Sequence, residues 1–136
     1  VDDALKAQKE FPEARKIVHF MQPHTPYVES NLEQSPNNPA SELSDIDPED
    51  AEKWSEVQLA EKGEIRPEIV RKHYKENLEY VMPYVEELIK ELHGVTVITS
   101  DHGEMMNEKG LYGHPQGANV KSLREVPWDI RNGGNL

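Results

Sequence analysis

The sequence contains no cysteine, so the chain forms no disulfide of its own and offers neither a thiolate metal ligand nor a cysteine nucleophile. No apolar run approaches the ~20 residues that a membrane-spanning helix needs. Residues 1–11 also lack the basic start and apolar stretch of a signal peptide. We therefore expect no membrane span, and the cytoplasm is the favoured compartment.

Basic residues are also scarce. Fifteen Lys and Arg stand against twenty-six Asp and Glu, which gives a formal charge of −11 over 136 residues. This balance disfavours nucleic acid or an anionic membrane as a partner, because binding to either needs clustered cations. With 35% hydrophobic residues, residues 1–136 are expected to form a single soluble α/β domain, or a fragment of one.

The spacing of apolar residues and the positions of Pro and Gly divide the chain into a few expected elements. Apolar residues at three- and four-residue steps predict a long helix from Arg66 to about Gly94, with a kink at Pro83 or two helices in succession. Residues 25–50 are rich in Pro, Asn, Ser and Asp and are expected to form a loop or lid insertion. Other expected elements are helices at residues 2–10 and 47–63 and strands at residues 16–21 and 95–100.

The apolar residues of "KIVHFM" are contiguous except for His19, as in a strand covered on both faces, and "VTVITS" is a β-branched run of strand length. A strand, a helical crossover and a second strand in one sheet make a parallel βαβ unit. The predicted fold class is therefore α/β with a mostly parallel sheet flanked by helices.

Ligands of open parallel sheets bind at the carboxyl ends of the strands. His24 follows the first expected strand, and Asp101 and His102 follow the second, so all three would lie at the same edge of a parallel sheet. A sharp turn at Gly103 would aim Asp101 and His102 at one metal ion. The alternative is that Asp101 caps a helix and His102 makes an ordinary hydrogen bond.

Two further polar residues follow in the same stretch. Lys109 and His114 are candidates to hold an anionic ester, and His114 to protonate a leaving group. The alternatives are a solvated lysine and a loop histidine. His24, between two prolines, is alternatively a rigid turn residue, and no functional role is assigned to His19, His73 or His93.

Four segments together resemble one family. "VITSDHGEMMNEKGLYGH" is similar to the metal and substrate segment in the carboxyl-terminal half of sulfatases and related hydrolases of the alkaline phosphatase superfamily. "HFMQPHTPY", "HYKENLEYVMPYVEELIKEL" and "LREVPW" resemble other segments of this family in the same order, over roughly residues 16–128. The closest resemblance is to short sulfatase-like proteins of halophilic archaea, which also suits the acid excess.

The resemblance implies part of an alkaline-phosphatase-like domain in which Asp101 and His102 ligate a divalent cation, either Ca²⁺, Mn²⁺, Zn²⁺ or Mg²⁺. It also implies that His24 and His114 face a sulfate or phosphate group, with Lys109 beside them. The substrate would be an anionic ester, as a small molecule or a sulfated or phosphorylated glycan. A metal-activated side-chain oxygen or a formylglycine would attack sulfur or phosphorus, and the intermediate would then be hydrolysed.

The sequence departs from this family in two ways. Lys109 and His114 stand in the reverse of the family's usual order. The Asp pair and the nucleophile of the family's amino-terminal half have no counterpart here, so we expect the chain to be the later part of a hydrolase. The alternatives are a non-catalytic, degenerate sulfatase-like binding domain and a metal-dependent phosphomutase.

Overall fold

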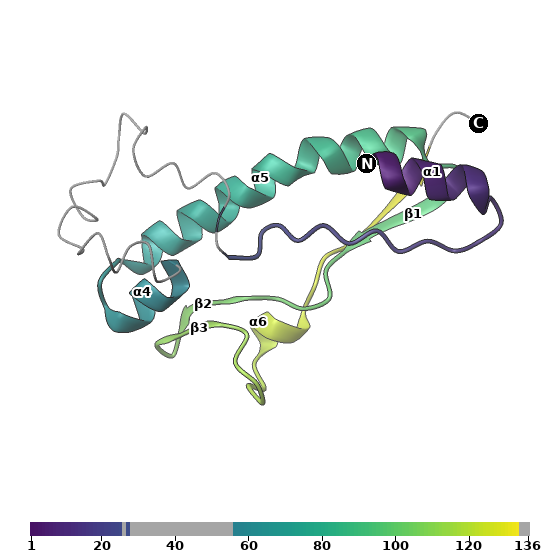
Figure 1. Ribbon diagram of the computed structural model, residues 1–136. Coiled ribbons are helices and arrows are strands. Elements are labelled where there is room, and N and C mark those ends of the chain that lie inside the picture. Colours follow the sequence, from purple (N-terminus) through teal and green to yellow (C-terminus); the bar gives the residue numbers. More distant parts are fainter. Residues whose placement is uncertain (26, 28–55, 134–136) are drawn as a thin grey trace.

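The computed structural model of the protein describes residues 1–25, 27 and 56–133 (Figure 1). The expected loop at residues 25–50 therefore lies almost entirely outside the described residues, as does the expected helix start near Asp47. Among the described helices, none is both long enough and apolar enough to cross a membrane. The described elements are α1 (Asp2–Glu10), α4 (Glu56–Lys62), α5 (Pro67–Glu91), β1 (Gly94–Thr99), β2 (Met105–Glu108), β3 (Leu111–Gly113), α6 (Lys121–Arg124) and β4 (Trp128–Gly133).

The long helix α5 runs along the molecule and contacts most of the other elements (Figure 1). Its buried residues recur at steps of three, four and seven and so form one face, as the sequence predicts. Pro83 lies inside this 25-residue helix without dividing it, so the expectation of two successive helices is wrong. A proline removes only one backbone hydrogen bond, and Val81 and Leu88, on either side of it, are both buried.

The sheet that contains β1 is antiparallel, which corrects the prediction of a parallel sheet. β1 pairs with β4 from Gly94 opposite Gly133 to Thr99 opposite Trp128. Residues 16–21 form no strand, and Ile17 is 98% exposed. A strand exists only where a neighbour satisfies its backbone groups, and the partner of β1 comes from the later segment 128–133.

One face of the β1–β4 sheet is exposed, which differs from the expected sheet flanked by helices. Val95 is 71% exposed and Ile130 is 59% exposed. Thr96 and Ile98, which alternate with the valines of β1, are partly buried. The β-branched composition thus predicted the strand correctly, but it did not distinguish a half-covered strand from a fully covered one.

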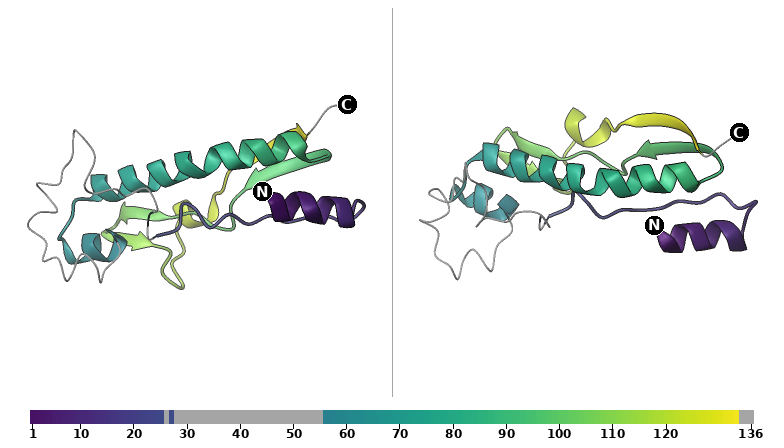
Figure 2. Two further views of the ribbon diagram at one scale, coloured as in Figure 1. Left: turned by 45° about the horizontal axis from the view of Figure 1, so that its top comes forward. Right: turned by 90° about the horizontal axis from the view of Figure 1, so that it is seen from above.

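A second two-stranded sheet is formed by β2 and β3, a hairpin that the sequence analysis did not predict. Asn107, Lys109 and Gly110 all have positive φ angles, of 86°, 57° and 76°, and they reverse the chain between the strands. Asn and Gly adopt this left-handed backbone most readily. The hairpin lies beside α4 and the first half of α5 (Figures 1 and 2).

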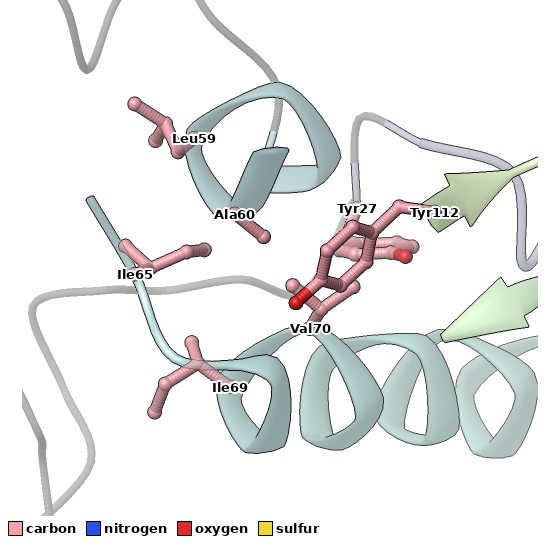
Figure 3. Packing of buried hydrophobic residues seen from close by; sticks show 7 residues of the cluster. All are labelled: Tyr27, Leu59, Ala60, Ile65, Ile69, Val70 and Tyr112. Atoms are coloured by element: carbon pink, nitrogen blue, oxygen red, sulfur yellow. The ribbon is translucent and has the colours of Figure 1, made fainter. Parts of the chain in front are cut away.

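The main apolar core joins this hairpin to α4 and the start of α5 (Figure 3). Val70 of α5 is fully buried, and Tyr112 of β3 is 6% exposed. Arg71 adds a polar contact by donating a hydrogen bond to the backbone oxygen of Met106 at 2.7 Å. The full cluster of buried residues is Tyr27, Leu59, Ala60, Ile65, Ile69, Val70 and Tyr112.

The expected helix at residues 2–10 is confirmed as α1, which lies along the carboxyl-terminal end of α5 (Figure 2). Gln8 joins the two helices through both ends of its amide. Its Nε2 donates to the backbone oxygen of Glu91 at 3.1 Å, and its Oε1 accepts from the backbone N–H of His93 at 3.3 Å. The first of these bonds satisfies a backbone oxygen that the end of a helix leaves free.

A buried histidine and glutamate join α4 to α5. His73 Nδ1 lies 3.8 Å from Glu56 Oε1, and their side chains are 7% and 10% exposed. Among the described residues, this nitrogen has no hydrogen-bond partner. Burial lowers the pKa of His73, and the nearby Glu56 carboxylate only partly opposes that effect.

We predict that His73 makes the protein less stable as the pH falls. Its folded pKa lies below its model value of 6.5, so the unfolded chain binds more protons in this range. The stability contribution is complete above pH 6.5 and is lost as the pH falls toward the folded pKa, at no more than about 1.4 kcal/mol per pH unit. Urea unfolding between pH 5 and 8 should show a steeper decline for the natural protein than for His73→Phe. The exposed control His93→Gln should follow the natural protein, and identical curves for His73→Phe would contradict the prediction.

A second prediction concerns Met105, which is completely buried. Met105→Ala should lower the free energy of unfolding by about 2–5 kcal/mol, because the truncation leaves a cavity. Met21 is 62% exposed, and Met21→Ala should change the free energy of unfolding by no more than about 0.5 kcal/mol. Urea denaturation measures both changes, and equal losses would contradict the assigned packing.

Candidate functional site

The candidate site lies at the open base of the β2–β3 hairpin. Met105 pairs with Gly113 and Met106 with Tyr112. Continuing this register by one residue places Glu104 opposite His114, and opposing side chains of an antiparallel pair lie on the same face. His102 comes two residues before Glu104, in the link from β1 to the hairpin.

These three side chains converge. His114 Nδ1 lies 3.1 Å from Glu104 Oε2, and the rings of His102 and His114 have their centroids 4.3 Å apart. One potential ligand atom from each of the three residues lies within 4.8 Å of the others. The Glu104 side chain is 18% exposed and that of His114 is 44% exposed, so the cluster is open to solvent on one side.

The backbone fixes the tautomer of His102. Its Nδ1 lies 2.8 Å from the backbone oxygen of Gly103, so this nitrogen carries the proton and donates it. The lone pair then remains on Nε2, which lies 3.7 Å from Asp101 Oδ2. A histidine that donates one ring N–H to a carbonyl and leaves the other nitrogen free has the form of a metal ligand.

Asp101 stands at the exposed edge of the cluster. Its Oδ1 accepts a hydrogen bond from the backbone N–H of His102 at 3.1 Å. Desolvation acts to raise the pKa of Asp101, but backbone hydrogen bonds and the nearby His102 and His19 outweigh it and lower that pKa. The carboxylate is therefore ionised at neutral pH, with Oδ2 directed toward His102.

Gly103 holds this arrangement in place. Its backbone N–H donates to the oxygen of Leu123 at 3.0 Å, while its own oxygen accepts from His102. A Cβ at this position would lie 1.8 Å from the backbone oxygen of Ser122, so α6 approaches too closely for any side chain. Glycine is required here by the approach of neighbouring backbone, and the close packing limits the freedom of His102.

The structure also brings His24 to the cluster, although the strand expected to deliver it is absent. The His24 ring lies 6.1 Å from the His114 ring, centroid to centroid. His24 Nδ1 contacts the backbone oxygen of Thr25, which leaves Nε2 as the acceptor, as in His102. The three residues expected at the strand ends thus lie near His114: His24 and His102 through their rings, and Asp101 through its contact with His102.

Lys109 is not brought to the other candidate residues. It lies in the turn beyond the last paired residues of the hairpin, Glu108 and Leu111, whereas Glu104 and His114 lie at its base. At ~3.4 Å per strand residue, the paired length from Met105 to Glu108 separates the two ends by roughly 10 Å. The expectation that Lys109 stands beside His114 has no support in this geometry.

The sequence analysis missed Glu104 as a candidate ligand. The signal was the turn "NEKG", whose asparagine and glycine favour a tight reversal. A hairpin centred on this turn places residues that lie about ten positions apart opposite each other, and Glu104 and His114 are such a pair. The spacing of the polar residues alone does not reveal this pairing.

The donor atoms fit a divalent cation. Two ligands of one ion at ~2.1 Å lie about 3.0–3.4 Å apart in octahedral or tetrahedral geometry, and never more than ~4.2 Å apart. The separation of 3.1 Å between His114 and Glu104 already falls in this range. The separation of 3.7 Å between His102 Nε2 and Asp101 Oδ2 lies below the upper limit. The 4.8 Å that encloses the potential ligand atoms of His102, Glu104 and His114 exceeds this limit, so the side chains must move closer before one ion contacts all three.

Glu104 also acts on the apolar core. Burial, followed by the charges of Glu56 and Glu104, raises the pKa of Tyr27. Burial and the charge of Glu104 likewise raise the pKa of Tyr74. Both phenols therefore remain neutral at physiological pH, and Glu104 carries negative charge at the border between the core and solvent. A cation is the natural partner for such a charge.

Comparisons with known proteins identify no relative. No protein-family model matches the chain, and no curated protein or solved structure matches it either. The functional interpretation therefore depends on the residues of the site and on the resemblance of the sequence motifs.

We predict that Gly103→Ala displaces the His102 loop. The added Cβ must move away from the Ser122 oxygen, which is backbone and cannot rotate aside. Gly63→Ala is the matched control, because its Cβ would meet nothing within 4 Å and costs only about 1–2 kcal/mol for a left-handed backbone with φ of +79°. Urea denaturation and the NMR shifts of His102 measure the two effects. A Gly103→Ala protein as stable as Gly63→Ala, with unchanged His102 shifts, would contradict the close contact.

Proposed function

We propose that this chain supplies the cation-binding part of a metal-dependent hydrolase of sulfate or phosphate esters. The observation that carries the proposal is the convergence of His102, Glu104 and His114 within 4.8 Å. Two histidines and one glutamate are the protein ligands of several hydrolytic zinc sites, which keep a further position for substrate. The resemblance of the surrounding motifs to sulfatases supports an anionic ester as the substrate.

In this proposal His102, Glu104 and His114 hold the cation, and an Asp101 oxygen is a fourth donor at the edge. When bound, the cation polarises a sulfuryl or phosphoryl oxygen of the ester and stabilises developing negative charge. His114 was expected from the sequence to face the ester. Its contact of 3.1 Å with Glu104 favours a place among the ligands instead.

His24 is then the side chain best placed to face the ester. Its ring lies beside that of His114, and within the described part of the chain it is Nδ1, not Nε2, that contacts the backbone. A protonated His24 would donate a hydrogen bond to an ester oxygen or a proton to the leaving group. Lys109 lies in the turn of the hairpin, at the opposite end from Glu104 and His114. Its proposed role is limited to attracting the anionic substrate through its charge.

A second candidate is a non-catalytic, degenerate sulfatase-like domain that binds an anionic ester without hydrolysing it. The position of Lys109 favours it, because a lysine beside the ester is part of the site that the resemblance implies. Both candidates use the same cation, and they differ only in turnover.

Turnover by the full-length protein tests the proposal. After supplementation with a divalent cation, 4-nitrophenyl sulfate or 4-nitrophenyl phosphate should be hydrolysed. His102→Ala should reduce kcat/KM by at least about 100-fold, because the cation loses its most fixed ligand. The exposed control His93→Ala should retain full activity. Ester binding without release of nitrophenol, with Zn²⁺, Mn²⁺, Ca²⁺ and Mg²⁺ each tried, would favour the binding domain and contradict hydrolysis.

A further inference from the structure

We infer that the cluster selects a transition cation of the zinc type over calcium and magnesium. The inference deepens the proposed function, since it rests on the same cation-binding cluster and names the class of ion. The resemblance left four ions open, whereas the donor atoms in the structure favour one class. The ligands proposed are His102 Nε2, a Glu104 carboxylate oxygen and His114 Nδ1.

The chemistry of the donor atoms favours a zinc-type ion. Two of the three converging side chains are imidazoles, which suit zinc, cobalt, nickel and copper. Calcium takes six to eight oxygen ligands, and magnesium prefers an octahedral shell of oxygens and water. The carboxylate oxygens at the described cluster come from Glu104 and Asp101, and Asp101 Oδ1 already accepts the backbone N–H of His102. An oxygen-preferring cation would have to fill most of its shell with water.

The contact between His114 and Glu104 also favours a zinc-type ion. Nδ1 and Oε2 are 3.1 Å apart, and each is an acceptor unless the imidazole nitrogen carries a proton. Two acceptors at this distance need a proton or a cation between them. A zinc-type ion bound by both atoms replaces that proton and requires almost no change in their separation.

The tautomer and the backbone of His102 are already fixed in a form that can bind an ion. The hydrogen bond from Nδ1 to Gly103 leaves Nε2 as the free nitrogen, and Gly103 is held in turn by Leu123. A ligand whose tautomer and backbone are fixed loses little freedom when an ion binds. Orienting contacts of this kind are typical of histidines that ligate zinc.

Because its ligands lie on both sides of the hairpin, a bound ion would also stabilise the folded chain. His102 and Glu104 precede β2, whereas His114 follows β3, so a bound ion would join the two strands at the base of the hairpin. An ion that binds only the folded chain stabilises it in proportion to its affinity. This supplies a measurement that is independent of catalysis.

The test is a comparison of ions on the full-length protein after treatment with a chelator. Isothermal titration calorimetry should give dissociation constants for Zn²⁺ and Co²⁺ at least about 100-fold lower than those for Ca²⁺ and Mg²⁺. Thermal unfolding should shift upward with Zn²⁺ and not with an equal concentration of Ca²⁺. Bound Co²⁺ should give the visible absorption bands of an ion with nitrogen ligands.

Single-residue variants test which side chains bind the ion. His102→Ala and His114→Ala should each weaken Zn²⁺ binding by at least about 100-fold, and Glu104→Gln by at least about 10-fold. The exposed residues His93 and Glu87 provide the matched controls His93→Ala and Glu87→Gln, which should bind as the natural protein does. Circular dichroism checks that each variant is folded. Where one is not, long-range ¹⁵N spectra of the natural protein should show Zn²⁺ shifting His102 Nε2 and His114 Nδ1.

Three outcomes would overturn the inference. Calcium or magnesium binding as tightly as zinc would contradict the class of ion while leaving the proposed hydrolase intact. Zinc affinity that is unchanged in His102→Ala and His114→Ala would place the ion elsewhere, and the absence of any binding would remove the site. Conversely, zinc bound at these residues in a protein that hydrolyses no ester would contradict the proposed function and leave this inference standing.

Discussion

The contact of 3.1 Å between Glu104 and His114 depends on the register of one short hairpin. A shift of the pairing by one residue would turn one of these side chains to the opposite face. The turn at residues 107–110 determines this register through backbone angles that asparagine and glycine tolerate. The chemistry of the cluster therefore begins with the local conformation of a turn that contains none of its ligands.

The hairpin is too short to be stable alone, and α5 supports it. Val70 and Tyr112 belong to the same buried cluster, and Arg71 of α5 holds the backbone of Met106. On the other side of the site, Leu123 and Gly103 hold the loop that carries His102. The apolar core thus fixes His114, and the backbone contact with α6 fixes His102, so the ligands are positioned from two directions.

Local patterns were sufficient to predict the helices at residues 2–10 and 67–91 and the strand β1, because each depends mainly on its own periodicity and composition. The parallel sheet was predicted wrongly, because which strand pairs with β1 depends on residues far apart in the sequence. β4 pairs with β1, although residues 16–21 have the more strand-like composition. At the site, His24, His102 and His114 lie together although the parallel strands expected to deliver His24 and His102 are absent. Glu104 was missed because it lies opposite His114 only once the hairpin is formed. The same hairpin places Lys109 in the turn at its other end.

The central claim is that His102, Glu104 and His114 bind one cation together. Anomalous diffraction at the zinc edge, from crystals of the full-length protein grown with Zn²⁺, tests it most directly. The account predicts a single strong peak about 2.0–2.2 Å from His102 Nε2, a Glu104 carboxylate oxygen and His114 Nδ1. Strong zinc peaks elsewhere, with none within bonding distance of these three side chains, would contradict it.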